Sequence, residues 1–307
     1  MSNDQAHIFD RELLLKRRER FASGFGQHDF LLQRVAEDLV SRLDAITRDF
    51  AVAADLGTHH GTVADRVAKS PRVGTMVKTD SSARLLQRQK GLRVACDEEA
   101  LPFRNASLDL VVSGLSLQHV NDLPGTLVQV RRALRPDGLF LAAVLGGRTL
   151  LELREAMAIA EEETCGGVSP RIAPFGDVRD YGALLQRAGF ALPVSDSDLV
   201  TVTYETPLHL MRELRAMGAS NALAARRRVP ATKRLLFRAS EVYAERHGME
   251  GGRVHATFEI IHLAGWAPHD SQQKPLRPGS ARTRLAEALG TQEIATGEKA
   301  APRSGRR

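Results

Sequence analysis

Apolar residues recur along this chain with two different periods, and the pattern predicts helices and strands in alternation. Positions 8–22 and 30–46 carry apolar residues at helical spacing, which is typical of amphipathic helices. A short apolar run at 51–56 follows and ends in a turn that contains Gly57 and Gly61. The chain is therefore expected to begin with two helices that precede a strand and a glycine turn.

From this turn to residue 145, short apolar runs alternate with helical patterns. Such alternation favours a parallel sheet with right-handed crossovers, and ligands of these sheets bind at the carboxyl ends of the strands. The predicted strands are 51–56, 73–79, 92–96, 108–112 and 139–145, and the predicted helices are 62–68, 83–90 and 122–134, the last closed by a turn at 135–138.

The rhythm changes after Thr149, where longer helices appear. We expect helices at 150–163, 177–188, 207–217 and 232–246, and strands up to about 203 and at 255–266. The last two strands should form an antiparallel hairpin that closes the sheet, with helices 149–163 and 207–246 inserted over the ligand site. The predicted organisation is an N-terminal helical segment at 1–48, a sheet domain at 49–266 with a helical cap at about 149–250, and a disordered tail at 267–307 with one short helix near 282–289.

Composition narrows the class of protein only moderately. The 307 residues, 43% of them apolar, are enough for one large domain with a cap, and the net charge of +6 permits acidic partners without requiring nucleic acid. Cys96 and Cys165 fit no metal spacing and favour a reduced compartment. No apolar run approaches the roughly 18–20 residues that span a bilayer, and no secretory signal is visible. We therefore expect a cytoplasmic protein.

Two basic clusters are interpreted mainly as solvated surface. Lys16, Arg17, Arg18 and Arg20 lie on the first helix, and 226–228 is a run of arginines. The alternative for each is contact with an anionic lipid surface or an acidic, membrane-proximal partner.

The glycine turn is the first candidate binding element. A strand that ends in such a turn and leads into a helix presents free backbone N–H groups to a ligand, and glycine allows the positive φ this requires. Asp55 precedes the turn and could hold its backbone N–H groups or contact the ligand. Gly57, Gly61 and Asp55 are therefore candidates for a cofactor site.

Further polar residues follow the later strands. Asp80 could accept hydrogen bonds from both hydroxyls of a ribose, or it could cap the next helix. Asp97 with Glu98 could accept from an adenine amino group, or they could be capping or solvated residues. Ser113 ends the fourth strand and belongs to the same candidate set.

Histidines offer weaker candidates for chemistry. His59 and His60 are adjacent and lack partners at metal-ligand spacing, so no metal site is predicted. His119 could be a base on the substrate side or a structural histidine. The chain shows no Ser-His-Asp elbow, no phosphate-loop lysine motif and no carboxylate pair suited to hydrolysis, so the catalytic residues are unassigned.

Several of these landmarks together resemble class I S-adenosylmethionine-dependent methyltransferases. The second half of the chain is more specific and is similar to the complex I assembly factor 5 family, with a further similarity to the malonyl-carrier-protein methyltransferase of biotin synthesis. The matching stretches are 55–57, Asp80, 97–103, 108–113 and 134–138 for the superfamily, and 8–11, 146–154, 166–175, 187–190 and 217–221 for the assembly factor family.

The resemblance implies a Rossmann-like α/β fold, S-adenosylmethionine as cofactor, and a subunit of respiratory complex I as partner, at the inner face of a membrane. Family members read Gly-Cys-Gly-x-Gly where this chain has His59 inside the turn. A β-carbon there would cost about 1–2 kcal/mol if the backbone is left-handed. Three functions follow: methyl transfer to a protein side chain or small acid, arginine hydroxylation as in mitochondrial relatives, or a non-catalytic assembly chaperone.

Overall fold

The computed structural model describes residues 7–273, 287 and 289–292. The chain forms two compact units, Met1–His269 and Asp270–Arg307. The helix predicted near 282–289 falls largely outside the described residues. In the part of the chain that is described, no helix is long and apolar enough to cross a membrane.

A seven-stranded sheet organises the first unit, in the order β3-β2-β1-β4-β5-β7-β6. The first five strands pair in parallel, and β7 pairs antiparallel with both β5 and β6. This confirms the predicted Rossmann-like sheet and its antiparallel closure. The strands are β1 (Phe50–Leu56), β2 (Val73–Asp80), β3 (Leu92–Ala95), β4 (Leu108–Gly114), β5 (Leu134–Leu145), β6 (Ala191–Tyr204) and β7 (Val254–Trp266).

Helices cover both faces of the sheet because successive side chains of a buried strand point to opposite sides. Along β4 and β5, Leu110 and Leu141 join one buried cluster with α2, while Val111 and Phe140 join a second cluster with α5 and α7. The helices are α1 (Arg11–Phe21), α2 (Phe30–Asp44), α3 (Thr62–Val67), α4 (Ala83–Gln87), α5 (Leu123–Ala133), α6 (Leu151–Cys165), α7 (Val178–Arg187), α8 (Pro207–Ala216) and α9 (Lys233–His247).

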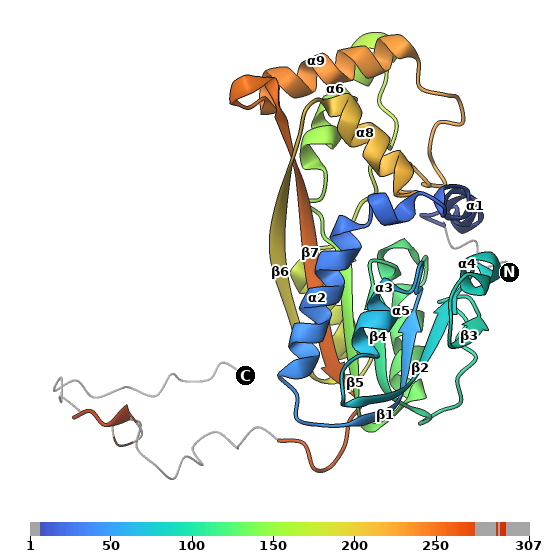
Figure 1. Ribbon diagram of the computed structural model, residues 1–307. Coiled ribbons are helices and arrows are strands. Elements are labelled where there is room, and N and C mark those ends of the chain that lie inside the picture. The colour runs from blue at the N-terminus through green and yellow to red at the C-terminus, as the bar shows by residue number, and fades with distance from the viewer. Residues whose placement is uncertain (1–6, 274–286, 288, 293–307) are drawn as a thin grey trace, which may run out of the picture. The chain divides into compact units, whose positions relative to one another are not determined.

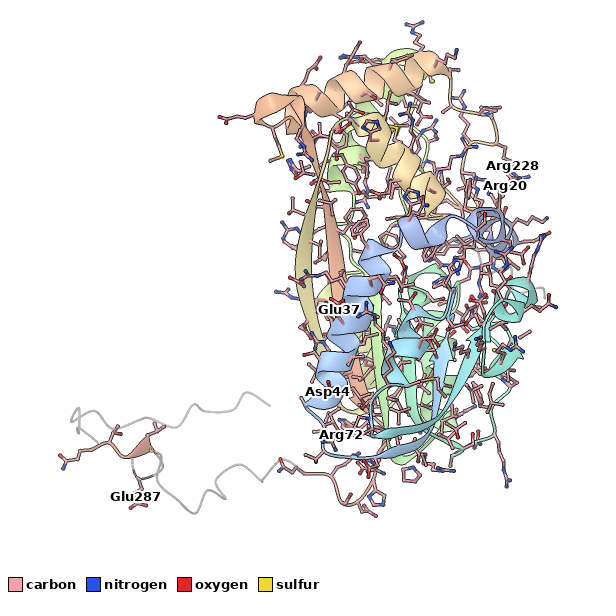
Figure 2. All side chains as sticks on the ribbon, in the orientation of Figure 1. Arg20, Glu37, Asp44, Arg72, Arg228 and Glu287 are labelled. Carbon is pink, nitrogen blue, oxygen red and sulfur yellow. The ribbon has the colours of Figure 1, made fainter. Side chains whose placement is uncertain are left out.

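The helix α2 shows how the sequence pattern fixes its packing. Its apolar side, including Leu32, Val35 and Leu39, is buried against the sheet. Glu37 and Asp44 are exposed, and Figure 2 shows them on the outer side of the helix. This confirms the amphipathic pattern predicted from the sequence.

The predicted cap is also present. Helices α6, α8 and α9 gather beyond one end of the sheet, where the long strands β6 and β7 extend towards them (Figure 1). Helix α1 lies beside this cap and is joined to it by a β-bridge between Phe9 and Leu223. The cap and α1 therefore stand over the edge at which the parallel strands end.

One predicted turn is wrong. Residues 135–138 do not close α5 but lie within β5, which begins at Leu134 and pairs there with Leu108. Arg135 donates a hydrogen bond to Asp109 over 2.7 Å, and the Ala267 N–H donates to the Gly138 carbonyl. These contacts tie the Pro-Asp-Gly stretch to both neighbouring segments, and it forms a bulge in β5, because the pairing with β4 jumps from Leu134 to Leu139 and Asp137 has a φ of +62°. Helix α4 also ends earlier than predicted, at Gln87.

Candidate functional site

The predicted cofactor residues meet at the carboxyl edge of the parallel strands. Asp80 ends β2, and the pairing of Asp80 with Ala95 places 97–98 directly beyond the neighbouring strand. The glycine turn follows β1, which lies between β2 and β4. Residues scattered over sixty positions of sequence are therefore neighbours in space, as the parallel topology requires.

The Asp55 side chain at the end of β1 holds the turn that follows this strand through hydrogen bonds. Its Oδ2 accepts hydrogen bonds from the Thr58 hydroxyl at 2.7 Å and from the Ala64 N–H at 3.1 Å. The carboxyl group is completely buried, and this burial raises its pKa to about 7. Asp55 thus supports the turn, which was one of the two roles left open by the sequence.

Glycine is required at Gly57 by its surroundings. Its φ is +64°, and a β-carbon there would collide with the Ser116 side chain and approach Glu98 Oε1 to 3.0 Å. Gly61 also has positive φ, +85°, at the start of α3. Gly57 lets the turn pass close to the loops that follow β3 and β4, whereas Gly61 faces Gln89 and Lys78.

His59 adopts the strained conformation considered from the sequence. Its φ is +52°, so a β-carbon does stand in a left-handed position. The backbone N–H donates to Asp80 Oδ2 over 3.0 Å, and ring Nε2 lies 3.4 Å from the Leu115 carbonyl oxygen. Burial, with the Arg18 charge as the next cause, lowers the pKa of His59 well below its usual range. The ring is therefore a neutral wall of the site.

Asp80 is buried, 1% exposed, and holds two backbone N–H groups. One is that of His59 and the other is that of Ser82, at 2.8 Å. The helix cap of α4 is supplied by the Ser82 hydroxyl, which accepts from the Leu85 N–H, so Asp80 is not the capping residue. Burial raises the pKa of Asp80, and the nearby Arg18 guanidinium opposes that rise.

Asp97 and Glu98 both pair with Arg11 of α1. Asp97 is 49% exposed, whereas Glu98 is 3% exposed and also accepts a 3.3 Å hydrogen bond from the Ser116 hydroxyl. Burial raises the pKa of Glu98, and Arg11 opposes it. The two acids thus offer acceptors at this edge, but a ligand would have to share them with an arginine.

Ser113 is fully buried inside β4. Its hydroxyl donates to the Leu56 carbonyl over 2.7 Å, which ties the end of β1 to β4. In this arrangement the hydroxyl shapes the turn rather than facing the ligand side.

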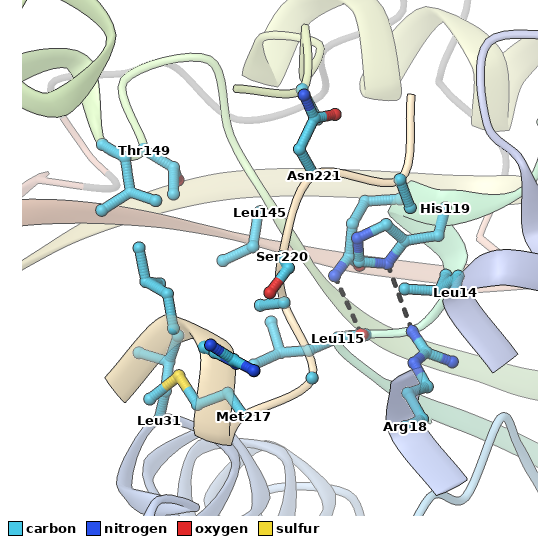
Figure 3. A pocket seen from close by; sticks show the side chains of 18 of the residues that line it. Leu14, Arg18, Leu31, Leu115, His119, Leu145, Thr149, Met217, Ser220 and Asn221 are labelled. Atoms are coloured by element: carbon cyan, nitrogen blue, oxygen red, sulfur yellow. Dashed lines mark hydrogen bonds between the residues drawn. The ribbon is translucent and has the colours of Figure 1, made fainter. Parts of the chain in front are cut away.

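Helix α1 supplies site residues that the sequence reading missed. Arg17 and Arg18 were predicted to be solvated, and that prediction is wrong for both. Arg17 donates to the Ser220 carbonyl at 2.8 Å, and Arg18 lies 3.3 Å from His119 Nδ1 (Figure 3). Arg11, Leu14 and Arg18 share one helix face at the spacing i, i+3, i+7, and that spacing was the available signal.

A cavity of about 280 Å³ lies between this edge and the cap. Its wall is mostly apolar, and Figure 3 shows Leu31, Leu145, Met217 and His119 around it. A second hollow, of about 450 Å³, is bordered by Asp97, Glu98 and Ser116. Leu14, Arg18 and His119 border both, so the two spaces meet at α1.

His119 is held in the wall between the rings of Phe9 and Phe175, both in edge-on contact. Burial and then the charge of Arg18 lower its pKa to about 3. His119 therefore stays neutral at physiological pH. The sequence left open whether His119 is a base or a structural residue. The structure shows that its ring is neutral and borders the cavity.

Comparison with known proteins agrees with this geometry. Residues 54–142 match the family described as "Methyltransferase domain". The arginine-hydroxylase NDUFAF5 of Danio rerio is 39% identical over 295 residues, which cover 93% of this chain and 91% of that protein. The chain belongs to the NDUFAF5 family. The human NDUFAF5 is 38% identical over 92% of this chain and 83% of its own length.

This NDUFAF5-family chain is also similar, at lower identity, to methyltransferases that carry a different name. The malonyl-[acyl-carrier protein] O-methyltransferase of Gallionella capsiferriformans is 30% identical, over 85% of this chain and 92% of that protein. Among solved structures, a candidate methyltransferase of Bacillus halodurans superposes with a TM-score of 0.55 at 18% identity, over 76% of this chain and 100% of the other. The YcgJ protein of Bacillus subtilis superposes with a TM-score of 0.53 at 15% identity, over 76% of this chain and 99% of the other. These structures show the same fold.

Proposed function

We propose that this NDUFAF5-family protein binds S-adenosylmethionine at the carboxyl edge of its sheet and modifies a protein side chain during respiratory complex I assembly. The observation that carries the proposal is that Asp80, Glu98 and the glycine turn gather at one edge of the sheet, where the turn borders a mostly apolar cavity and Glu98 borders the hollow next to it. The kinship with proteins named arginine-hydroxylase NDUFAF5 supports the choice of a protein substrate.

The residues present suit the cofactor's polar groups. Asp80 would accept from the ribose hydroxyls, and Asp97 or Glu98 from the adenine amino group. Each such charge-assisted hydrogen bond is worth about 1.5–3 kcal/mol. The glycine turn, with His59 in it, would face the methionine end. When bound, the cofactor supplies an activated methyl group.

The chain's own contribution to chemistry would be positioning and exclusion of water. The cavity wall is mostly apolar, and its His59 and His119 rings are neutral, so it can desolvate a side chain that enters it. Alignment of two groups in such a space can account for much of a methyl transfer without a general base. This agrees with the lack of an assigned catalytic residue.

Arginine hydroxylation is the second candidate, favoured by the kinship with arginine-hydroxylases that are 39% identical to this chain. Mass spectrometry of complex I subunits from cells with and without the gene separates the reactions. A subunit that lacks one oxygen in the deletion strain supports hydroxylation, and one that lacks a methyl group supports methyl transfer. Unchanged masses with failed assembly would instead leave the chaperone function.

Replacement of His59 with glycine is expected to strengthen cofactor binding severalfold. The change removes an imidazole from the cavity wall, and the relief of the left-handed β-carbon, about 1–2 kcal/mol, stabilises the turn itself. Calorimetric titration with S-adenosylhomocysteine measures the effect. His60→Ala is the control, since His60 has no positive φ and stacks on Phe25. Equal or weaker binding by His59→Gly would show that the ring does not obstruct the site.

A further inference from the structure

Asp29 is the sole carboxylate among the described residues that border the 280 Å³ cavity. It stands immediately before α2, whose first residue is Phe30. Most of the wall is apolar, and His28, the neighbour of Asp29 in the chain, also borders the cavity and lies 3.5 Å from Glu213. Asp29 is half-buried, and an acid that borders a mostly apolar cavity without a counter-ion is available to a cationic ligand.

The fold makes little use of this carboxylate. Asp29 occupies the N-cap position of α2, yet its side chain makes no capping hydrogen bond to the helix backbone. Oδ2 accepts one hydrogen bond, from the neutral amide of Gln33 at 2.6 Å. Within the described part of the chain, no lysine, arginine or histidine forms an ion pair with it. The common structural explanation for an aspartate at this position is therefore not met.

Nearby rings do not neutralise Asp29. Phe25 and His60 stack with their centres 4.1 Å apart, and both border the cavity beside it. Burial, followed by the charge of Arg88, lowers the pKa of His60, although Asp29 acts in the opposite direction. His60 is therefore neutral at pH 7 and leaves the negative charge uncompensated.

Two of the arginines in the wall are already matched by acids outside it. Arg171 pairs with Glu161 at 2.7 Å, and Asp80 and Glu98 are the acids that act on Arg18. Arg215 lies with its guanidinium 5.9 Å from the centre of the Phe21 ring. The cavity thus has an acid at the α2 end whose charge no residue of its wall is shown to balance.

We propose that Asp29 receives a positively charged nitrogen group, a guanidinium or an ammonium, inside this cavity. The inference rests on the proposed function, because it assumes that cofactor and substrate meet there. A carboxylate beside aromatic rings suits such a group in both charge and shape. The group can come from the substrate side chain or from the amino-acid end of the cofactor.

Asp29→Asn tests the assignment, with Asp44→Asn as the matched control. Both residues belong to the ends of α2, but Asp44 lies exposed at the far end (Figure 2). S-adenosylhomocysteine is titrated into each protein by calorimetry, and modification of the complex I subunit is measured by mass spectrometry in a complemented deletion strain. A loss of roughly 10- to 100-fold in one of the two readouts is expected for Asp29→Asn alone, the equivalent of one charge-assisted hydrogen bond.

The two readouts distinguish the sources of the group. Weaker binding of S-adenosylhomocysteine assigns it to the cofactor, while unchanged binding with lost modification assigns it to the substrate. Asp29→Glu, which keeps the charge, should retain more function than Asp29→Asn, whereas a purely structural role would make it the more disruptive change. Full binding and full modification by Asp29→Asn would overturn the inference. If the protein without any substitution neither binds S-adenosylhomocysteine nor modifies the complex I subunit, the proposed function itself is refuted.

Discussion

Asp80→Asn is expected to weaken binding of S-adenosylhomocysteine by roughly a hundredfold or more, because two charge-assisted hydrogen bonds are worth about 3–6 kcal/mol together. Asparagine keeps the size of the side chain but only one of the two oxygens, Oδ2 and Oδ1, that accept from the N–H groups of His59 and Ser82. The substitution removes the charge proposed to bind the ribose hydroxyls and also leaves one backbone N–H group without its acceptor, so affinity and stability are measured separately. Calorimetric titration gives the affinity, and the thermal midpoint reports the fold.

The same substitution at Asp65 is the control for Asp80. Asp65 lies in α3 just after the turn and pairs with Lys78 at 2.6 Å, but it is 62% exposed. Asp65→Asn should leave the affinity nearly unchanged. If Asp80→Asn loses binding yet restores complex I assembly in a deletion strain, the protein works as a chaperone and its cofactor is dispensable. Normal affinity in Asp80→Asn would refute the placement of the cofactor itself.

Glu161→Ala is expected to lower the free energy of unfolding by about 3–5 kcal/mol, the usual cost of breaking a buried ion pair. The Glu161 carboxylate in α6 is fully buried and accepts from the Ser169 N–H and hydroxyl at 2.8 and 2.7 Å. Arg171 donates to it over 2.7 Å, so the substitution leaves that guanidinium without its acid. Urea denaturation followed by circular dichroism measures the change.

Glu163→Ala provides the comparison for Glu161, on the same helix. Glu163 pairs with Arg238 at 2.6 Å, but its side chain is 44% exposed. Water screens such a pair, so its removal should cost less than about 1 kcal/mol. Equal losses for the two variants would mean that the buried pair contributes no more than a surface pair.

The pH dependence of stability gives a second test of Glu161. Burial alone would raise its pKa, but Arg171 and Ser169 outweigh that effect and hold the pKa at about 2, below the ordinary value of 4.5. Because the pKa is lowered by folding, the stabilisation is complete above pH 4.5 and is lost as the pH falls towards 2. The loss amounts to about 3 kcal/mol. Between these limits, the Glu161→Gln variant should therefore show a flatter stability curve than the unmodified protein.

Local patterns in the sequence determined much of this protein. The alternation of apolar runs and helical spacing predicted the parallel strands, and parallel topology alone brought Asp80, Glu98 and the glycine turn to one edge. These predictions hold because hydrophobic periodicity and crossover handedness depend on neighbours in sequence. The left-handed backbone of His59 could also be expected from the sequence, since its strain follows from the geometry of a short turn.

Only the tertiary structure showed which other side chains lie at that edge and in the cavity beside it. Arg18 belongs to a cluster that the sequence predicts to be solvated, yet it faces His119, and Arg11 pairs with Glu98, because α1 is held against the cap loop. Asp29 looks like an ordinary helix cap until its missing cap bond and the cavity beside it are seen. Periodicity fixes which face of a helix is polar, but the partner of that face depends on contacts between segments two hundred residues apart, and no local rule encodes those contacts.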